Sequence, residues 1–294
     1  MRWPALAYGT PRKLPKPRTL KGRVVVLDIA FAANVGGGGF ERVTKPFIDG
    51  LGNRLVLWVD HHDHQAHINY ADDQRFVLHT KAEHGACPEI ITPELVRRAG
   101  KYDTICCHTD FDGLCAAAKW ILGGAEPYPG SDKDAYAIDT RLGQPSPTGA
   151  LLDRAIRAQP KNDQLRTTII RYLVGGIIDQ HLQAEITHAA LALEVLEQRA
   201  QELALRYQVQ SDVAAVDATN STDAYDKTWL LLLGQDLAPI SLVYDSHTVT
   251  IAAKFDSGID LLALLGISGG MPTRVSVPRR RLEEVLEALH NRQT

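Results

Sequence analysis

Short apolar runs recur through the first half of the chain, and each run ends on an ionisable side chain. The runs are Arg23–Leu27 before Asp28, Arg54–Val59 before Asp60, Thr104–Cys107 before His108, and Ala135–Ile138 before Asp139. Continuous apolar runs bounded by polar segments are typical of buried strands in a parallel sheet. Helical patterns lie between them, at Phe40–Leu51, Pro93–Gly100 and Leu114–Leu122. This alternation of strand and helix predicts a doubly wound α/β fold.

The second half of the chain has a different pattern. His181–Gln208 carries leucines and valines at helical spacing, which predicts helices that bridge two domains. Strands are predicted at Val213–Val216, Ile240–Tyr244 and Thr248–Ala253, and a closing helix at Leu282–Leu289. We therefore expect an α/β protein in three parts: a parallel-sheet domain with flanking helices over residues 1–185, a helical linker over 186–211, and a smaller α/β C-terminal domain over 212–294.

The strand ends carry the candidate chemistry. Parallel strands bring their carboxyl ends to one edge of the sheet, and this edge is where ligands bind in open α/β folds. Asp28, the triplet Asp60-His61-His62, the segment His108–Asp112 and Asp139 should therefore converge in space. Converging carboxylates repel one another and cannot all stay ionised without cations. Oxygen ligands mixed with imidazoles suit Mn²⁺ or a similar divalent ion, so the pattern predicts a metal site with more than one ion.

Composition narrows the range of partners. A net charge of −3 and a pI near 6.4 exclude a strongly basic nucleic-acid coat and favour a small or short anionic substrate. No stretch approaches the ~18–20 apolar residues that span a bilayer, so no membrane partner is expected. The residues before Gly22 predict an extended surface arm and lack the apolar segment of a signal peptide. The cysteines lack Cys-x-x-Cys spacing, which predicts free thiols in a reducing cytoplasm.

Three of these motifs carry a family resemblance. Asp60-His61-His62 after an apolar strand, His108-x-Asp110-x-Asp112-Gly113 and the strand-end Asp28 resemble the DHH phosphoesterase superfamily. That superfamily includes single-strand exonucleases, nanoRNases, cyclic-dinucleotide phosphodiesterases, pyrophosphatases and exopolyphosphatases. Its usual motif order is reversed here, because His-x-Asp-x-Asp follows Asp-His-His, so the chain looks circularly permuted. Permutation is tolerated because the sheet edge is assembled in space and not in sequence.

The resemblance implies a set of metal ligands. It includes Asp179, because Tyr172–Asp179 resembles the family's fourth motif, an apolar glycine-containing helix that ends in a metal-binding Asp. The other interpretation of Asp179 is a carboxylate on a helix surface. The implied roles are His108 and Asp110 on one Mn²⁺, Asp112, His61 and Asp179 on the other, Asp28 bridging both, His62 facing the substrate phosphate and Asp60 orienting an imidazole. Mg²⁺ or Co²⁺ are alternatives. With any of these metals, the two ions would activate the attacking water and neutralise charge on the phosphate.

The C-terminal segment resembles the DHH-associated domain. Ser268–Arg274 stands where that domain has Gly-Gly-Gly-His-Pro, with Met271 replacing the substrate-binding histidine, which leaves the substrate class open. The candidate substrate-binding residues are Gly269, Gly270, Arg274 and Lys254.

The resemblance implies a Mn-dependent two-metal phosphoesterase that hydrolyses small nucleotides or short single-stranded oligonucleotides. The nanoRNase, phosphoadenosine-phosphate phosphatase and single-strand exonuclease activities all fit this description. A pyrophosphatase or exopolyphosphatase, or a catalytically inactive binding scaffold, are the alternatives. The sequence leaves the oligomeric state open, with a homodimer among the options.

Overall fold

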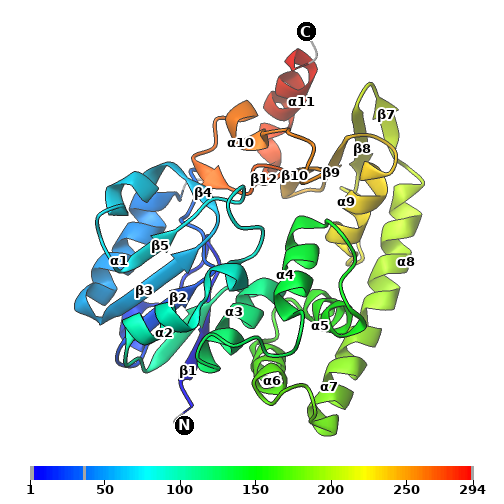
Figure 1. Ribbon diagram of the computed structural model, residues 1–294. Helices are drawn as coiled ribbons and strands as arrows, with labels where there is room; N and C mark the ends of the chain where they lie inside the picture. The colour runs from blue at the N-terminus through cyan, green and yellow to red at the C-terminus, as the bar shows by residue number, and fades with distance from the viewer. Residues whose placement is uncertain (1–2, 36–37, 293–294) are drawn as a thin grey trace. The chain divides into compact units, whose positions relative to one another are not determined.

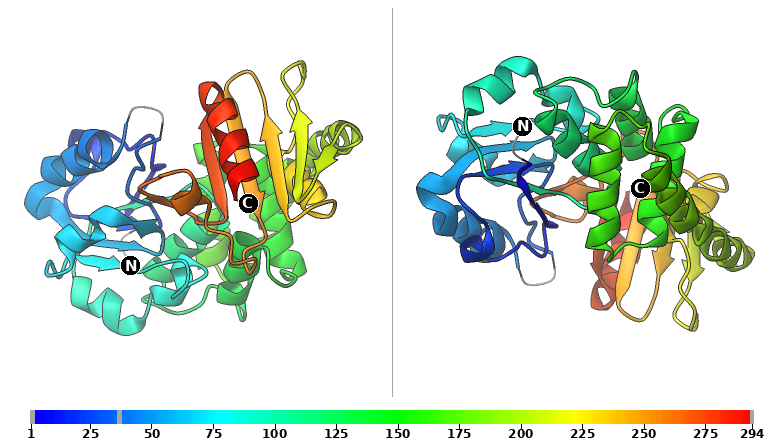
Figure 2. Two further views of the ribbon diagram at one scale, coloured as in Figure 1. Left: turned by 90° about the horizontal axis from the view of Figure 1, so that it is seen from above. Right: turned by 90° about the horizontal axis from the view of Figure 1, so that it is seen from below.

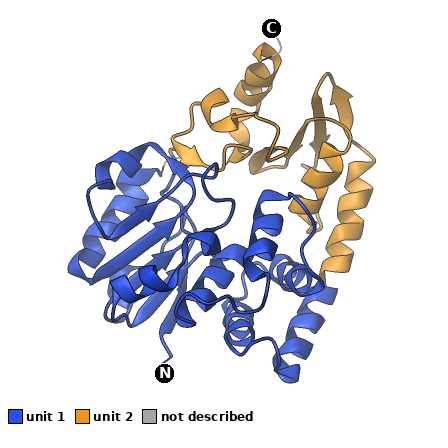
Figure 3. Ribbon diagram, viewed as in Figure 1, with its two compact units in different colours: residues 1–33, 38–191 blue, residues 34–37, 192–294 orange. Residues whose placement is uncertain are grey.

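The chain divides into two compact units (Figure 3). The computed structural model describes residues 3–35 and 38–292. Unit 1 comprises residues 1–33 and 38–191, and unit 2 comprises residues 34–37 and 192–294. The boundary falls inside the segment 186–211, between helices α7 (Gln180–Leu191) and α8 (Leu193–Ala204).

Unit 1 is built on a five-stranded parallel sheet in the order β1-β6-β2-β3-β5 (Figure 1). The strands are β1 (Ala5–Tyr8), β2 (Val24–Leu27), β3 (Leu55–Asp60), β5 (Phe76–Leu78) and β6 (Thr104–Cys107). Every neighbouring pair is parallel. The sheet confirms the predicted α/β class and the strands predicted before Asp28, Asp60 and His108.

Helices cover both faces of this sheet (Figure 2). Val24 and Val26 face the side covered by α1 (Lys45–Leu51), whereas Val25 and Leu27 face the side covered by α3 (Phe111–Ile121). Both faces are apolar because each is packed, which explains why β2 and β3 have no alternation of polar and apolar residues. The carboxyl ends of the strands are left as the edge at which polar groups can gather.

The other elements of unit 1 are short strands and helices. They are η1 (Pro17–Thr19), η2 (Phe40–Thr44), η3 (Gly52–Arg54), β4 (Asp63–His64), η4 (Gln65–Tyr70), η5 (Cys87–Ile90), α2 (Pro93–Ala99), α4 (Ser131–Thr140), α5 (Pro147–Ala158) and α6 (Asp163–Val174). Side-chain caps fix several helix starts: Thr92, Ser146 and Asn162 accept hydrogen bonds from backbone N–H groups in the first turns of α2, α5 and α6.

Two sequence predictions for unit 1 are wrong. Ala135–Ile138 is not a fourth strand but part of helix α4. Ala135 and Ile138 both enter the core, and their spacing of three residues is helical; a run this short fits either structure by periodicity alone. The N-terminal segment is not only an extended surface arm, because β1 pairs with β6 at one edge of the sheet. Its four residues are half-buried.

Unit 2 is a mixed sheet in the order β12-β10-β9-β8-β7, in which only β8 and β9 are parallel. Its elements after α8 are β7 (Gln208–Gln210), β8 (Val213–Asp217), α9 (Lys227–Gln235), β9 (Ile240–Tyr244), β10 (Thr248–Ala253), α10 (Leu261–Leu264), β11 (Gly269–Gly270), β12 (Arg274–Pro278), η6 (Arg279–Arg281) and α11 (Leu282–Asn291). Leu203 of α8 and Leu230 of α9 pack against Val216 and Val243 of the sheet. The smaller α/β unit predicted for the C-terminal part is therefore present.

Two predictions from composition can be compared with the fold. All four cysteines are buried and free, as predicted. Across residues 3–35 and 38–292, every helix is too short or too polar to cross a membrane.

Candidate metal centre

Strand register places Asp28 at the centre of the site. Leu27, the last residue of β2, lies opposite Val59 of β3 and Cys107 of β6. The backbone N–H of Asp28 donates to the Val59 carbonyl at 2.8 Å, and the N–H of His108 donates to the Leu27 carbonyl at 3.1 Å. The side chains that follow the three strands therefore meet at one edge of the sheet, as the sequence predicts.

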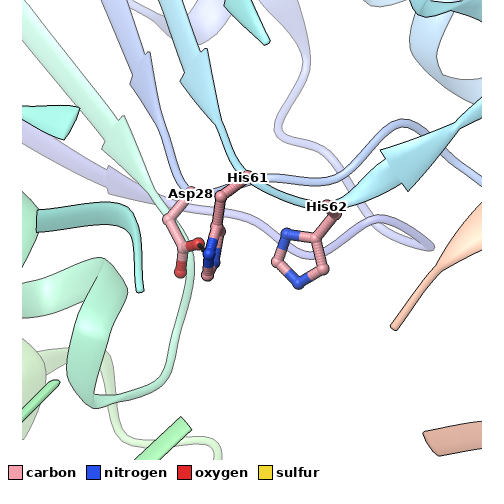
Figure 4. Close-up of side chains that lie close together, drawn as sticks. All are labelled: Asp28, His61 and His62. Atoms are coloured by element: carbon pink, nitrogen blue, oxygen red, sulfur yellow. Dashed lines mark ion pairs between the residues drawn. The ribbon is translucent and has the colours of Figure 1, made fainter. Parts of the chain in front are cut away.

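Asp28 and His61 lie against each other at this edge (Figure 4). Nε2 of His61 is 3.1 Å from Oδ1 of Asp28, and both side chains are almost fully buried. His62 lies beside them, and its Nδ1 is 2.8 Å from Oδ1 of Asp60. The Asp60 carboxylate is fully buried and fixes the orientation of the His62 ring, which is the role that the family resemblance implies for it.

The backbone is shaped to bring Asp28 into this position. Asp28 has a φ of 60°, a left-handed backbone conformation that Asp adopts more readily than most residues. Such conformations cluster at functional sites. Gly113, in the first turn of α3, leaves the space that the Asp28 carboxylate needs. A Cβ at Gly113 would lie 3.0 Å from Oδ2 of Asp28 and 2.9 Å from Cβ of His108.

Asp28, His61 and His62 form the first group of ligand atoms, and a second group lies on the other side of Asp28. Nδ1 of His108 is 2.7 Å from Oδ2 of Asp110 and 3.6 Å from Oδ2 of Asp28. These three residues could hold one metal ion together, because their ligand atoms all lie within 4.8 Å of one another. The group is the more open one, since the Asp110 side chain is 45% exposed.

The third group contains a residue that was not predicted as a ligand. His61, Asp112 and Asp139 bring their ligand atoms within 4.8 Å of one another. Asp139 reaches the group from the last turn of α4. The sequence places Asp139 among the groups that converge at the sheet edge, which the structure confirms, but does not include it among the ligands. The element was predicted wrongly, yet the apolar residues before Asp139 still anchor it beside the sheet edge.

Lys81 completes the third group. Its Nζ is 2.9 Å from Nε2 of His61 and is hydrogen-bonded to Asp139. The side chain is 2% exposed. No sequence signal marks this residue, because it is a single lysine in a polar turn, without periodicity or a motif.

The charges of the cluster strongly perturb its ionisable groups. Burial, followed by the charges of Asp112 and Asp110, raises the pKa of Asp28. Burial alone would also raise the pKa of Asp60, but the charge and hydrogen bond of His62 outweigh it and hold that pKa at about 2. Asp28 is thus the carboxylate that most needs a nearby cation in order to stay ionised.

Lys81 and His61 compete for one proton. Burial lowers the pKa of the Lys81 ammonium, but Asp139, Asp112 and Asp28 outweigh it and raise the pKa above its usual value. Burial and the Lys81 charge lower the pKa of His61, while Asp112 and Asp28 raise it by more. Only one proton fits between nitrogens 2.9 Å apart, and we assign it to Lys81 because an amine is the stronger base.

The donor set fits a divalent cation. Among the described residues, none offers a well-directed hydrogen bond to either carboxylate oxygen of Asp28, or to Nδ1 of His108. Buried carboxylate oxygens without donors are costly unless a cation pairs with them. Carboxylates and imidazoles together suit Mn²⁺ and similar ions. The cluster is therefore of the class of carboxylate–imidazole sites that can hold a divalent metal ion.

The remaining predicted residues lie elsewhere. Asp179 is not brought into the cluster: it is exposed, and its Oδ1 accepts hydrogen bonds from the N–H groups of His181 and Leu182 at the start of α7. The apolar helix predicted to carry it ends at Val174, before Gly175 and Gly176, so Asp179 belongs to the next helix. The candidate substrate-binding residues all lie in unit 2; they are Lys254, Gly269, Gly270 and Arg274. Their role stays a prediction.

Comparisons with known proteins add little to this picture. A scan against protein-family models and a search of curated proteins find no match. Among solved structures, a pGpG-specific phosphodiesterase from Vibrio cholerae is similar over 92% of this chain and 98% of its own, with 11% identity and a TM-score of 0.43. An uncharacterized protein from Helicobacter pylori is similar over 92% of this chain and 100% of its own, with 11% identity and a TM-score of 0.23. Both scores are too low to establish a common fold, so the activity of neither protein bears on this chain.

Proposed function

We propose that the chain is a metal-dependent phosphoesterase that hydrolyses small nucleotides or short single-stranded oligonucleotides. The observation that carries the proposal is the position of Asp28. Its buried carboxylate lies between two imidazoles, His61 and His108, and lacks a well-directed hydrogen bond from the described residues. Such a carboxylate is suited to a divalent cation, and metal centres of this kind serve phosphoryl transfer.

The residues that would hold an ion are Asp28, His108 and Asp110, whose ligand atoms lie together on the more exposed side of the cluster. A divalent ion bound there, Mn²⁺ in our proposal, would supply Lewis-acid charge to the phosphate and lower the pKa of a coordinated water. The first turn of α3 adds partial positive charge at the same edge, because the N–H groups of a helix start are not all used within the helix.

His62 is the residue proposed to contact the substrate. Its Nδ1–H donates to Asp60, which leaves Nε2 available for a phosphate oxygen. When Nε2 also carries a proton, it can donate a charge-assisted hydrogen bond to an anionic phosphate oxygen. The side chain of His62 is 16% exposed, whereas Asp60 is fully buried, and this places the ring and not the carboxylate within reach of a ligand.

A substrate panel assayed with Mn²⁺ tests the proposal. It contains RNA of two to five nucleotides, adenosine bisphosphate, cyclic dinucleotides, linear dinucleotides, pyrophosphate and polyphosphate. We expect hydrolysis of a nucleotide phosphoester that stops on exhaustive chelation and returns when Mn²⁺ is added. Preference for pyrophosphate or polyphosphate would assign the site to the alternative class.

Paired aspartate variants connect activity to the site. Asp28→Asn keeps the shape of the side chain and removes its charge, so we expect loss of both turnover and metal binding in a folded protein. Asp72→Asn is the matched control, because Asp72 is exposed and lies outside the cluster. Activity of Asp28→Asn close to that of the wild type would refute the proposal. Metal binding without hydrolysis of any substrate would instead support an inactive scaffold.

A further inference from the structure

Lys81 contacts the ligand atoms that a second metal ion would need. Its Nζ is 2.9 Å from Nε2 of His61 and hydrogen-bonded to Asp139, two of the three members of the His61–Asp112–Asp139 group. The lysine is buried, and its backbone N–H donates to Asp63 at 3.2 Å. The ammonium is therefore part of the interior of the cluster and not a surface group resting on it.

The tautomer of His61 makes the contact exclusive. Nδ1 of His61 is 2.9 Å from the carbonyl oxygen of His84, which can only accept, so Nδ1 carries a hydrogen. Nε2 then offers its lone pair, and the Lys81 ammonium donates to it at 2.9 Å. A metal ion would require the same lone pair. Lys81 and a metal ion cannot both use Nε2 of His61.

The acidic neighbours of the Lys81 ammonium also favour a positive charge at this position. Oδ1 of Asp28 and Oδ2 of Asp112 lie 3.1 and 3.3 Å from Nε2 of His61, and Asp139 contacts Nζ directly. Carboxylates converging on one nitrogen lone pair repel it unless a positive charge stands among them. Lys81 supplies that charge from within the chain.

We propose that Lys81 takes the place of the second metal ion, so that the protein binds a single divalent ion, at Asp28, His108 and Asp110. This inference rests on the metal site of the proposed function but not on its substrate. It replaces the two-ion arrangement implied by the family resemblance. The chain holds one exchangeable cation and one fixed cation in adjacent positions of the cluster.

Metal stoichiometry tests the inference without an activity assay. Manganese is titrated calorimetrically into the metal-free full-length chain, and bound metal is counted by elemental analysis after desalting. We expect one ion in the wild type and two in Lys81→Met, which keeps the length of the side chain and removes its charge. The matched control is Lys119→Met, since Lys119 is also buried, is paired with Asp132 and lies outside the cluster; it should still bind one ion.

Two further measurements keep the inference testable if Lys81→Met does not fold. The electron paramagnetic resonance spectrum of the Mn²⁺-loaded wild type should be that of an isolated ion, and a spin-coupled pair would overturn the inference. His61→Ala should keep the single ion, whereas His108→Ala should lose it. Two ions in the wild type would overturn the inference and leave the proposed function standing. No bound ion in the wild type would overturn both.

Discussion

Gly113→Ala is a sharp test of the position assigned to Asp28. The added Cβ would lie 2.9 Å from Cβ of His108, 3.0 Å from its backbone carbon and 3.0 Å from Oδ2 of Asp28. Moving the Asp28 carboxylate relieves only one of these contacts, so the start of α3 or the His108 backbone must shift as well. Gly113 does not have a positive φ, and alanine therefore introduces crowding without backbone strain.

The magnitude follows from two opposing effects. Crowding by one methyl group in a packed region costs roughly 1–3 kcal/mol. Replacing glycine by alanine in a helix returns at most about 1 kcal/mol. With the full helix gain, the net loss in the free energy of unfolding is about 0–2 kcal/mol, which lowers Tm by up to roughly 8 °C for a unit of this size. Because the crowded residues are His108 and Asp28, two of the three proposed ligands, we expect Mn²⁺ affinity to fall about 10–100-fold.

Thermal unfolding and manganese titration of the same samples measure both effects. Gly234→Ala in unit 2 is the control, since its Cβ would meet Ser241 and Tyr207, which lie far in sequence from the cluster residues and belong to the other unit. The control should lower Tm and leave Mn²⁺ affinity unchanged. A lowered Tm with unchanged affinity in Gly113→Ala would argue against Asp28 and His108 as ligands.

Three other predictions follow from single contacts. Asp60→Asn should lower kcat about 10–100-fold with the number of bound ions unchanged, because the contact that orients the His62 ring is weakened; steady-state kinetics and metal analysis check this. Asp179→Asn should leave Mn²⁺ affinity unchanged and lower the free energy of unfolding by at most about 1 kcal/mol, as expected for a change at a helix cap. Weaker Mn²⁺ binding would return Asp179 to the ligand set. Asp245 is paired with Lys227. Burial raises its pKa, but hydrogen bonds, that of Lys227 first, outweigh burial and lower the pKa from 3.8 to about 2. Ionised Asp245 therefore contributes about 2 kcal/mol to the free energy of unfolding above pH 4, and this contribution is lost as the pH falls towards 2. Asp245→Asn should abolish that part of the pH dependence in denaturant unfolding.

The sequence could predict the part of the site that depends on strand ends. Asp28, His61 and His108 each follow a run that is apolar on both faces, and a buried parallel strand explains such a run. Once the strands are parallel, their carboxyl ends must share an edge, so the convergence of these side chains needs no knowledge of register. For the same reason the prediction does not depend on the permuted order of the motifs.

The sequence could not predict the parts that depend on tertiary packing. Asp139 was expected at the sheet edge, but as the end of a strand and not as a ligand; it reaches the cluster from a helix whose four-residue apolar run also fits a strand. Asp179 was expected at the end of an apolar helix, but that helix stops at a pair of glycines, and the carboxylate caps the next helix instead. Lys81 has no local signal, since its burial is decided by His61 and Asp139, which lie far from it in the sequence.

The asymmetry of the cluster gives a physical reason for a fixed cation at one of its two sides. His61, Asp112 and Lys81 are almost fully buried, whereas His108 and Asp110 are 19% and 45% exposed at their side chains. Loss of an ion from the buried side would leave carboxylates uncompensated in a low-dielectric region, which is strongly destabilising. Loss of an ion from the exposed side leaves Asp110, which water can solvate, and the buried Asp28, beside which the Lys81–His61 pair remains. A lysine on the buried side therefore allows the chain to fold before metal arrives and restricts exchange to the side that a substrate can reach.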